Sequence, residues 1–230
     1  MAWQTSLSNG NDSVQVPTSG PYVGDWIIDA LAGNDTVIGW TGNDTFYGAG
    51  GNDYLFGHLG NDYLFGEADN DTLIGDDGND YLDGGTGADW LEGGNGQDTL
   101  YGGGAPSGIN NADYLFGGSG DDNYYHNFAA GGVTVIDDLS GNQFNNADVL
   151  RLINAPSSLS VQFGTDRSTL YIFQQGELDD GNFDNGIIIR GMLTNLGNNG
   201  VGTIENVYVN GSQYSTWLTD VHSTWTGAFG

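Results

Sequence analysis

Large apolar residues recur every nine positions through the first half of the chain, and each stands isolated among polar and glycine-rich residues. They are Val37, Phe46, Leu55, Leu64, Leu73, Leu82, Leu91 and Leu100. Alternate side chains of a strand point to opposite faces, so a single apolar residue suits the inward position of a short strand. The pattern therefore predicts a three-residue strand in each nine-residue unit and a turn over the other six residues.

Acidic and glycine positions follow the same period. An Asp precedes each apolar residue by two positions, in the series Asp35, Asp44, Asp53, Asp62, Asp71, Asp80, Asp89 and Asp98. Gly ends every unit, and a second Gly stands two residues before the Asp in seven of the eight units. Because Gly tolerates positive φ, these positions predict tight turns. Two more units, with Asp113 and Asp122, follow a six-residue insertion.

A row of Asn residues accompanies the Asp residues. Asn directly precedes the Asp in six successive units, at Asn34, Asn43, Asn52, Asn61, Asn70 and Asn79. Asn tolerates a left-handed backbone and bonds to nearby backbone groups. We therefore expect these side chains to steady each turn through local hydrogen bonds.

Stacking of the units would place the Asp residues in two rows. Two units make one coil of 18 residues, and successive coils would lay their strands in two parallel sheets about 4.8 Å apart. One row then holds Asp35, Asp53, Asp71 and Asp89, and the other holds Asp44, Asp62, Asp80 and Asp98. Carboxylates roughly 5 Å apart repel each other unless a cation lies between them. Carboxylate and carbonyl oxygens at high coordination number favour calcium over zinc or copper.

The repeat resembles the RTX (repeats-in-toxin) calcium-binding nonapeptide G-G-x-G-x-D-x-U-x. The likeness covers residues 31–102 continuously and extends through residue 126. It departs from the motif at the second Gly, which is replaced in the earlier units by Trp40, Ala49, His58, Glu67 and Asp76. The resemblance implies an all-β, right-handed parallel β-roll, a type of β-helix solenoid, with calcium between turn n and turn n+2.

The resemblance also implies which residues bind calcium. Side-chain ligands would come from Asp35, Asp44, Asp53, Asp62, Asp71, Asp80, Asp89, Asp98, Asp113 and Asp122. Metal-site glycines would be Gly33, Gly42, Gly51, Gly60, Gly78, Gly87 and Gly96. Six pairs lie within the two rows, and Asp89/Asp113 and Asp98/Asp122 would add two, so we expect about six to eight Ca²⁺ ions. Each unit buries only one wholly inward side chain, so metal binding would supply much of the folding free energy.

Three regions are expected along the chain. Residues 1–30 form an N-terminal cap with decayed units around Asp12 and Asp25, which either cap the roll or bind metal, and residues 31–126 form the roll. Residues 127–230 contain strand-like runs starting near 133, 148, 159, 168, 187 and 203. This last region resembles the domain that often follows RTX repeats in haemolysin-type calcium-binding proteins. We expect it to cap the roll and cover a sheet edge, with a short helix from Ser215.

Composition and missing motifs restrict the function. The chain has 30 acidic and 3 basic residues, and a net charge of −27 repels nucleic acid and anionic lipid. The absence of Cys excludes disulfides and zinc–thiolate sites. The sequence contains no H-E-x-x-H, no G-x-S-x-G and no long apolar span. We therefore expect a non-enzymatic protein without a transmembrane segment, and keep an enzyme with a site in the C-terminal half as a third hypothesis.

The main hypothesis is a secreted calcium-binding RTX protein that folds on binding Ca²⁺ and has a structural or adhesive role outside a bacterial cell. In this family the C-terminal tail often carries an uncleaved type I secretion signal, and the chain begins without a recognisable N-terminal signal. The sequence does not indicate the biological partner or the oligomeric state.

The alternative hypothesis is a carbohydrate-binding accessory module, of the kind attached to polysaccharide-modifying enzymes. It rests on aromatic residues that flank the inward apolar residues and are expected to face outward in columns. Tyr54, Tyr63, Tyr81 and Trp90 directly precede an inward residue, and Tyr47, Phe56, Phe65 and Tyr101 directly follow one. Such columns either bind an extracellular polysaccharide or stiffen the sheets through contacts with one another.

Overall fold

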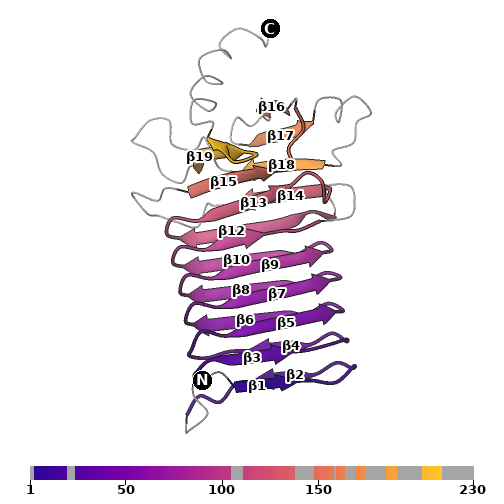
Figure 1. Cartoon of the computed structure of the whole chain (residues 1–230), viewed down its shortest axis with the longest axis vertical. Helices are drawn as coiled ribbons and strands as arrows, with labels where there is room; N and C mark the ends of the chain where they lie inside the picture. Colours follow the sequence, from indigo (N-terminus) through magenta and orange to yellow (C-terminus); the bar gives the residue numbers. More distant parts are fainter. Residues whose placement is uncertain are drawn as a thin grey trace.

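The computed structural model describes residues 3–19, 24–104, 111–137, 148–157, 159–163, 169–174, 185–190 and 204–213. All the regular elements named within these ranges are β-strands, which form two sheets of ten strands each. Figure 1 shows the strands stacked one above the next along the long axis of the molecule. The predicted parallel β-roll is therefore confirmed. Within the same ranges, no helix is long and apolar enough to cross a membrane.

Odd-numbered and even-numbered strands of the repeats belong to different sheets, here called sheet A and sheet B. Sheet A contains β1 (Trp3–Ser6), β3 (Trp26–Asp29), β5 (Thr45–Gly50), β7 (Tyr63–Ala68), β9 (Tyr81–Thr86), β11 (Thr99–Tyr101) and β13 (Asn123–Asn127). Sheet B contains β2 (Ser13–Gln15), β4 (Thr36–Ile38), β6 (Tyr54–Leu59), β8 (Thr72–Asp77), β10 (Trp90–Asn95), β12 (Asp113–Ser119) and β14 (Gly132–Asp137). Every neighbouring pair in these two series is parallel.

The C-terminal strands continue both sheets. In sheet A, β15 (Asp148–Ile153) and β19 (Ile204–Val209) extend the parallel series, and β20 (Ser212–Gln213) folds back on β19. In sheet B, β18 (Asn185–Arg190) pairs with β14, followed by antiparallel β17 (Leu170–Gln174) and β16 (Leu159–Phe163). Strands β14 to β19 coincide with the six strand-like runs of the sequence. The helix expected from Ser215 lies outside the described residues.

The strands of the repeats are longer than the sequence pattern predicts. A typical strand, Tyr54–Leu59, has six residues and runs through the Gly that ends the unit. Only three residues then remain for the turn, here Gly60, Asn61 and Asp62. The side-chain pattern does not predict these extra residues, because they carry no inward apolar side chain. They belong to the strand because the backbones of adjacent coils remain paired there, as His58 does with Asp76. Parallel ladders need only aligned backbones, whatever the side chains.

The core is a single file of apolar side chains between the two sheets. The inward residue of each strand, from Val37 to Leu100, is fully buried, and Leu115 and Tyr124 continue the file. Burying one such side chain contributes about 1.5–3 kcal/mol, whereas ordering the backbone of one residue costs about 1–2 kcal/mol. Apolar burial alone therefore offsets only part of the cost of ordering a nine-residue unit.

Candidate metal centre

Twelve Asp residues form two rows along the turns of the roll. The first row, before the strands of sheet B, contains Asp12, Asp35, Asp53, Asp71, Asp89 and Asp113. The second row, before the strands of sheet A, contains Asp44, Asp62, Asp80, Asp98, Asp122 and Asp148. Apart from Asp12, each of these side chains is at most 3% exposed. The structure thus brings together in rows all ten Asp residues predicted from the sequence.

One oxygen of each carboxylate is held by the neighbouring coil. The backbone N–H of Asp35 donates to Oδ1 of Asp53 at 2.7 Å, and Asp53 donates to Asp71 at 2.8 Å. The same bond links every consecutive pair in both rows, with N···O distances from 2.6 to 3.2 Å. These bonds fix the direction of each carboxylate, so the second oxygen of each group points to an equivalent place in every coil.

The second oxygen is buried without a hydrogen-bond partner in nine of these carboxylates. They are Asp35, Asp44, Asp53, Asp62, Asp71, Asp80, Asp89, Asp98 and Asp122. A buried acceptor without a partner is costly, and more so when it carries charge. These orphaned oxygens are the feature of the fold that a bound cation would satisfy.

Backbone carbonyls lie beside the orphaned oxygens. At the Gly that ends a unit, here Gly66, an added Cβ would come within 3.0 Å of both Oδ2 of Asp71 and the carbonyl oxygen of Gly84. The same pair of groups meets at Gly39, Gly48, Gly75 and Gly93. Only a residue without a side chain leaves this space to the oxygens. Hard oxygen donors of two kinds, contributed by successive coils, suit calcium.

Burial shifts the acidity of the rows. Desolvation, reinforced by carboxylates of adjacent coils, raises the pKa of Asp71 and Asp98 to about 8. It raises the pKa of Asp62 and Asp80 to about 7. The charged form of each carboxylate is therefore unfavourable unless a positive charge lies close by. A divalent cation between coils would supply that charge.

The predicted metal-site glycines lie at the tightest points of the turns. Gly33, Gly42, Gly51, Gly60, Gly78, Gly87 and Gly96 have φ between 117° and 154°. A Cβ on Gly60 would collide with the carbonyl oxygen of Gly42, one coil earlier. Nowhere in the described residues do three His, Cys, Asp or Glu side chains converge. Two carboxylates supplemented by backbone oxygens are what this architecture offers, and a direct role for these glycine carbonyls stays a prediction.

A comparison with protein families supplies independent evidence. The family described as RTX calcium-binding nonapeptide repeat (4 copies) matches residues 27–55, 47–82, 56–91, 74–105 and 108–128. Residues 27–128 therefore carry repeats that match the RTX calcium-binding nonapeptide. The expected metal, calcium, agrees with this family, whereas the match does not set the number of ions. It ends at residue 128, so the likeness of residues 127–230 to a haemolysin-type C-terminal domain stays a prediction. No curated protein matches the chain.

The two decayed N-terminal units differ from each other. Asp12 takes its place in the first RTX row, but its Oδ2 accepts two hydrogen bonds from Ser8, at 2.7 Å each, and these bonds lower its pKa. In the other unit, Trp26 takes the place of a row Asp as hydrogen-bond donor, because its backbone N–H donates to Oδ1 of Asp44 at 2.7 Å. Asp25 instead stands where later units have Asn, and accepts from the N–H of Asn43. Of the two, only Asp12 aligns with the Asp residues.

The Asn row stabilises the roll in a different way from the one predicted. Oδ1 of Asn34 accepts the backbone N–H of Asn52 at 3.0 Å, and the series continues through Asn52 and Asn70. Asn43, Asn61 and Asn79 form the matching series on the other edge. The bonds therefore run between coils and not to the local backbone, because stacking places the next coil closer to the amide than its own turn.

Sequence reasoning missed the last member of the second row. The N–H of Asp122 donates to Oδ1 of Asp148 at 2.8 Å, and Asp148 is 1% exposed. Its only sequence signal is the triplet Asp148-Val149-Leu150, which matches the last part of the RTX unit but lacks the preceding glycines. A search for units with Gly two residues before the Asp therefore does not find Asp148.

The first row ends differently. Thr134 aligns with Asp113 and takes the position of the next Asp. His126, in place of the usual Gly, contacts the Thr134 hydroxyl through Nδ1 at 2.9 Å. Burial lowers the pKa of His126 to about 4, so the ring is neutral at pH 7. A neutral polar pair thus closes this row.

The aromatic columns stack along the roll. The rings of Tyr47 and Phe65 are 5.1 Å apart and nearly parallel, and those of Tyr101 and Tyr125 are 4.0 Å apart. Tyr81 bridges the gap between Phe65 and Tyr101. Stacked rings cover one another's faces, which a sugar would need for stacking. The geometry favours the sheet-stiffening interpretation over carbohydrate binding.

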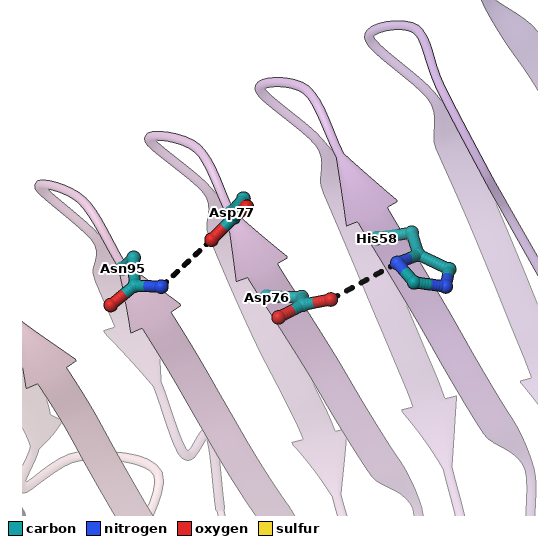
Figure 2. Close-up of polar contacts among 4 residues, drawn as sticks. All are labelled: His58, Asp76, Asp77 and Asn95. Atoms are coloured by element: carbon teal, nitrogen blue, oxygen red, sulfur yellow. Dashed lines mark hydrogen bonds and ion pairs between the residues drawn. The ribbon is translucent and has the colours of Figure 1, made fainter.

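Side chains near the ends of adjacent strands also pair between coils, as Figure 2 shows. Nδ1 of His58 on β6 lies 3.0 Å from Oδ2 of Asp76 on β8, and Asn95 on β10 donates to Asp77 at 2.7 Å. His58 and Asp76 both have φ of 82°, a region costly for residues with a Cβ.

Proposed function

We propose that this chain is a secreted protein whose RTX repeats fold when Ca²⁺ binds between the coils. The observation that carries the proposal is the set of nine buried carboxylate oxygens without partners, aligned in two rows. In the absence of a cation these oxygens oppose folding, because they are desolvated and face like charges. With calcium the same oxygens become ligands, so binding free energy is converted into folding free energy.

Calcium levels on the two sides of a cell membrane suit such a switch. Extracellular calcium modules typically bind with dissociation constants of about 10⁻⁴–10⁻³ M, above cytosolic concentrations. Proteins with RTX repeats are typically secreted. The metal-free chain would stay loose inside the cell and close after export. About six to eight ions would offset about 12 to 16 of the 27 net negative charges.

Outside the cell we propose a structural or adhesive role without catalysis. The buried carboxylates repeat with the same environment in coil after coil, which suits repeated ion binding. A hydrolase that uses carboxylates needs two with different environments, one of them with a raised pKa, at a single place. The stacked aromatic faces and the long rigid shape are properties of a spacer or an attachment module.

A calcium titration of chelator-stripped protein, followed by far-UV circular dichroism, tests the folding proposal. We expect a cooperative gain of β-sheet signal with calcium and little change with magnesium at equal ionic strength, because Mg²⁺ demands octahedral geometry and dehydrates reluctantly. A spectrum that already shows full β-sheet content without calcium, and does not change on its addition, would contradict calcium-driven folding.

A further inference from the structure

The second Asp row extends beyond the family match. The match ends at residue 128, whereas Asp148 follows Asp122 in the row by 26 residues. The N–H of Asp122 donates to Oδ1 of Asp148 at 2.8 Å, as in every earlier step of the row. Both side chains are at most 1% exposed, and Oδ2 of Asp122 is buried without a partner.

A third oxygen lies beside this orphaned atom. In the preceding coil, the space at Gly93 is shared by Oδ2 of Asp98 and the carbonyl oxygen of Gly117. At Gly117 the corresponding space is shared by Oδ2 of Asp122 and the hydroxyl oxygen of Tyr124. Tyr124 accepts the N–H of Gly117 at 2.9 Å through this oxygen, so its hydroxyl is held in place. A phenol oxygen therefore lies beside Oδ2 of Asp122, where the preceding coil shows a backbone carbonyl oxygen.

We propose that Asp122 and Asp148, with the Tyr124 hydroxyl beside them, form an additional calcium site that fastens the C-terminal strands to the repeats. The inference rests on the proposed function, since it assumes that the rows bind calcium. Asp148 is the first residue of β15, which pairs with β13 of the repeats on one side and with β19 on the other. An ion at this point would connect the last repeat coil to the C-terminal part of sheet A.

Among the described residues, no equivalent carboxylate follows Asp113 on the other edge of the roll. There Thr134 and the neutral ring of His126 occupy the positions that Asp and Gly hold in the repeats. Asn185, on β18, lies 3.3 Å from Nε2 of His126, so polar groups without charge follow the first row. Within the described part of the chain, the carboxylate row reaches the C-terminal strands along the edge of sheet A.

The experiment counts bound calcium in the full chain with Asp148→Asn. The amide oxygen of Asn still accepts the N–H of Asp122, so the variant keeps the ladder bond but loses the charge. We expect equilibrium dialysis to give one ion fewer per chain than in the unsubstituted protein. Amide hydrogen exchange in β15 should also become faster in saturating calcium. As a matched control, Asp137→Asn removes a part-exposed carboxylate at the end of β14, outside both rows, and should leave the count unchanged.

The outcomes separate this inference from the proposed function. A full ion count in Asp148→Asn overturns the additional site, even when the unsubstituted protein folds on calcium. An unsubstituted protein that binds no calcium overturns both proposals. Native mass spectrometry gives the ion count of the folded molecules alone, so partial unfolding of the variant does not obscure the result.

Discussion

At the scale of single residues, two turn positions make opposite demands on the chain. The second position of the motif has φ near 80° but holds residues with side chains, such as His58 and Glu67. A residue with a Cβ costs about 1–2 kcal/mol in this region. At the fourth position, where Gly60 stands, a side chain would strike the preceding coil. The second position of the motif is therefore strained but variable, whereas the fourth position admits only Gly.

Replacing the strained Glu67 with Gly should stabilise the protein. Glu67 has φ of 76° and an exposed side chain, so Glu67→Gly removes backbone strain without emptying the core. We expect a gain of about 0.5–1 kcal/mol after the greater entropy of Gly in the unfolded chain is included. Urea unfolding in saturating calcium measures the change. Glu67→Ala, which loses the charge but keeps the Cβ, should give no comparable gain; an equal gain in both variants would attribute the effect to charge.

Gly60 should tolerate no side chain. In Gly60→Ala the new Cβ would strike the carbonyl oxygen of Gly42, at a φ of 139°. We expect a loss of about 3 kcal/mol or more, since neighbouring backbone must move. Gly50→Ala is the control, because no atom lies within 4 Å of the added Cβ and its φ is not positive. Thermal unfolding midpoints that fall equally in both variants would contradict the steric explanation.

At the scale of elements, the repeated strand and its turn explain which parts of the site could be predicted. The nine-residue period was enough to find all ten repeat Asp residues, because each lies at the same offset from a buried apolar residue. The period did not identify Asp148, because this residue lacks the glycines that precede Asp in the repeats. It also did not show that Trp26, one residue after Asp25, donates its backbone N–H to Asp44. The hydrogen bond from the backbone N–H of Asn52 to Oδ1 of Asn34 was also not predicted. The general preference of Asn for local backbone partners does not show which groups of the next coil lie within reach.

A substitution within a row should have opposite effects with and without calcium. Asp71→Asn removes a carboxylate whose pKa burial raises to about 8, while its amide oxygen still accepts the N–H of Asp53. We expect the metal-free variant to be more stable than the unsubstituted protein at pH 8. In saturating calcium we expect it to be less stable by about 1–3 kcal/mol, because ligand contacts are lost.

Far-UV circular dichroism in chelator and urea unfolding in calcium measure the two effects of Asp71→Asn. The matched control is Asp29→Asn on β3, which changes a part-exposed carboxylate outside the rows. Its stability should shift little in either condition. Destabilisation of Asp71→Asn in chelator as well as in calcium would mean that the carboxylate stabilises the coils by itself.

At the scale of the whole molecule, the nine-residue repeat determines both the stacking of the coils and the position of the acidic residues. Parallel stacking was predictable because one period governs the glycines, the acids and the apolar residues together. The end of sheet B was less predictable. There β17 pairs antiparallel with β18 and with β16, and these strands share no repeat from which the pairing could be inferred. The net charge of −27 is concentrated in a structure that holds eleven Asp residues nearly inaccessible to water.

The metal-free protein should lose stability as the pH rises. Burial raises the pKa of row carboxylates from an ordinary value of 3.8 to about 6 at Asp44 and about 8 at Asp98. The folded state therefore binds more protons than the unfolded state between pH 4 and 8, so the free energy of unfolding falls across this interval. Protons neutralise the rows at low pH, and in the proposed function calcium takes their place at high pH.

Far-UV circular dichroism of chelator-treated protein at pH 5 and at pH 8 provides the measurement. We expect more β-sheet signal at pH 5, and added calcium to increase the signal far more at pH 8 than at pH 5. A metal-free protein that is more stable at pH 8 would show that the row carboxylates are neutralised by another route.

The hydrogen bonds of the Asp rows give the roll a polarity. In every described pair, the amide of one coil donates to the carboxylate of the coil that follows it in the chain. Removing coils from the N-terminal side would expose carboxylate oxygens, which water solvates readily. Removing them from the C-terminal side would leave buried amides without acceptors, which is more costly. The roll therefore presents carboxylate acceptors at its N-terminal end and N–H donors toward its C-terminal end. Each coil depends on the coil that follows it for the acceptor of its Asp N–H group.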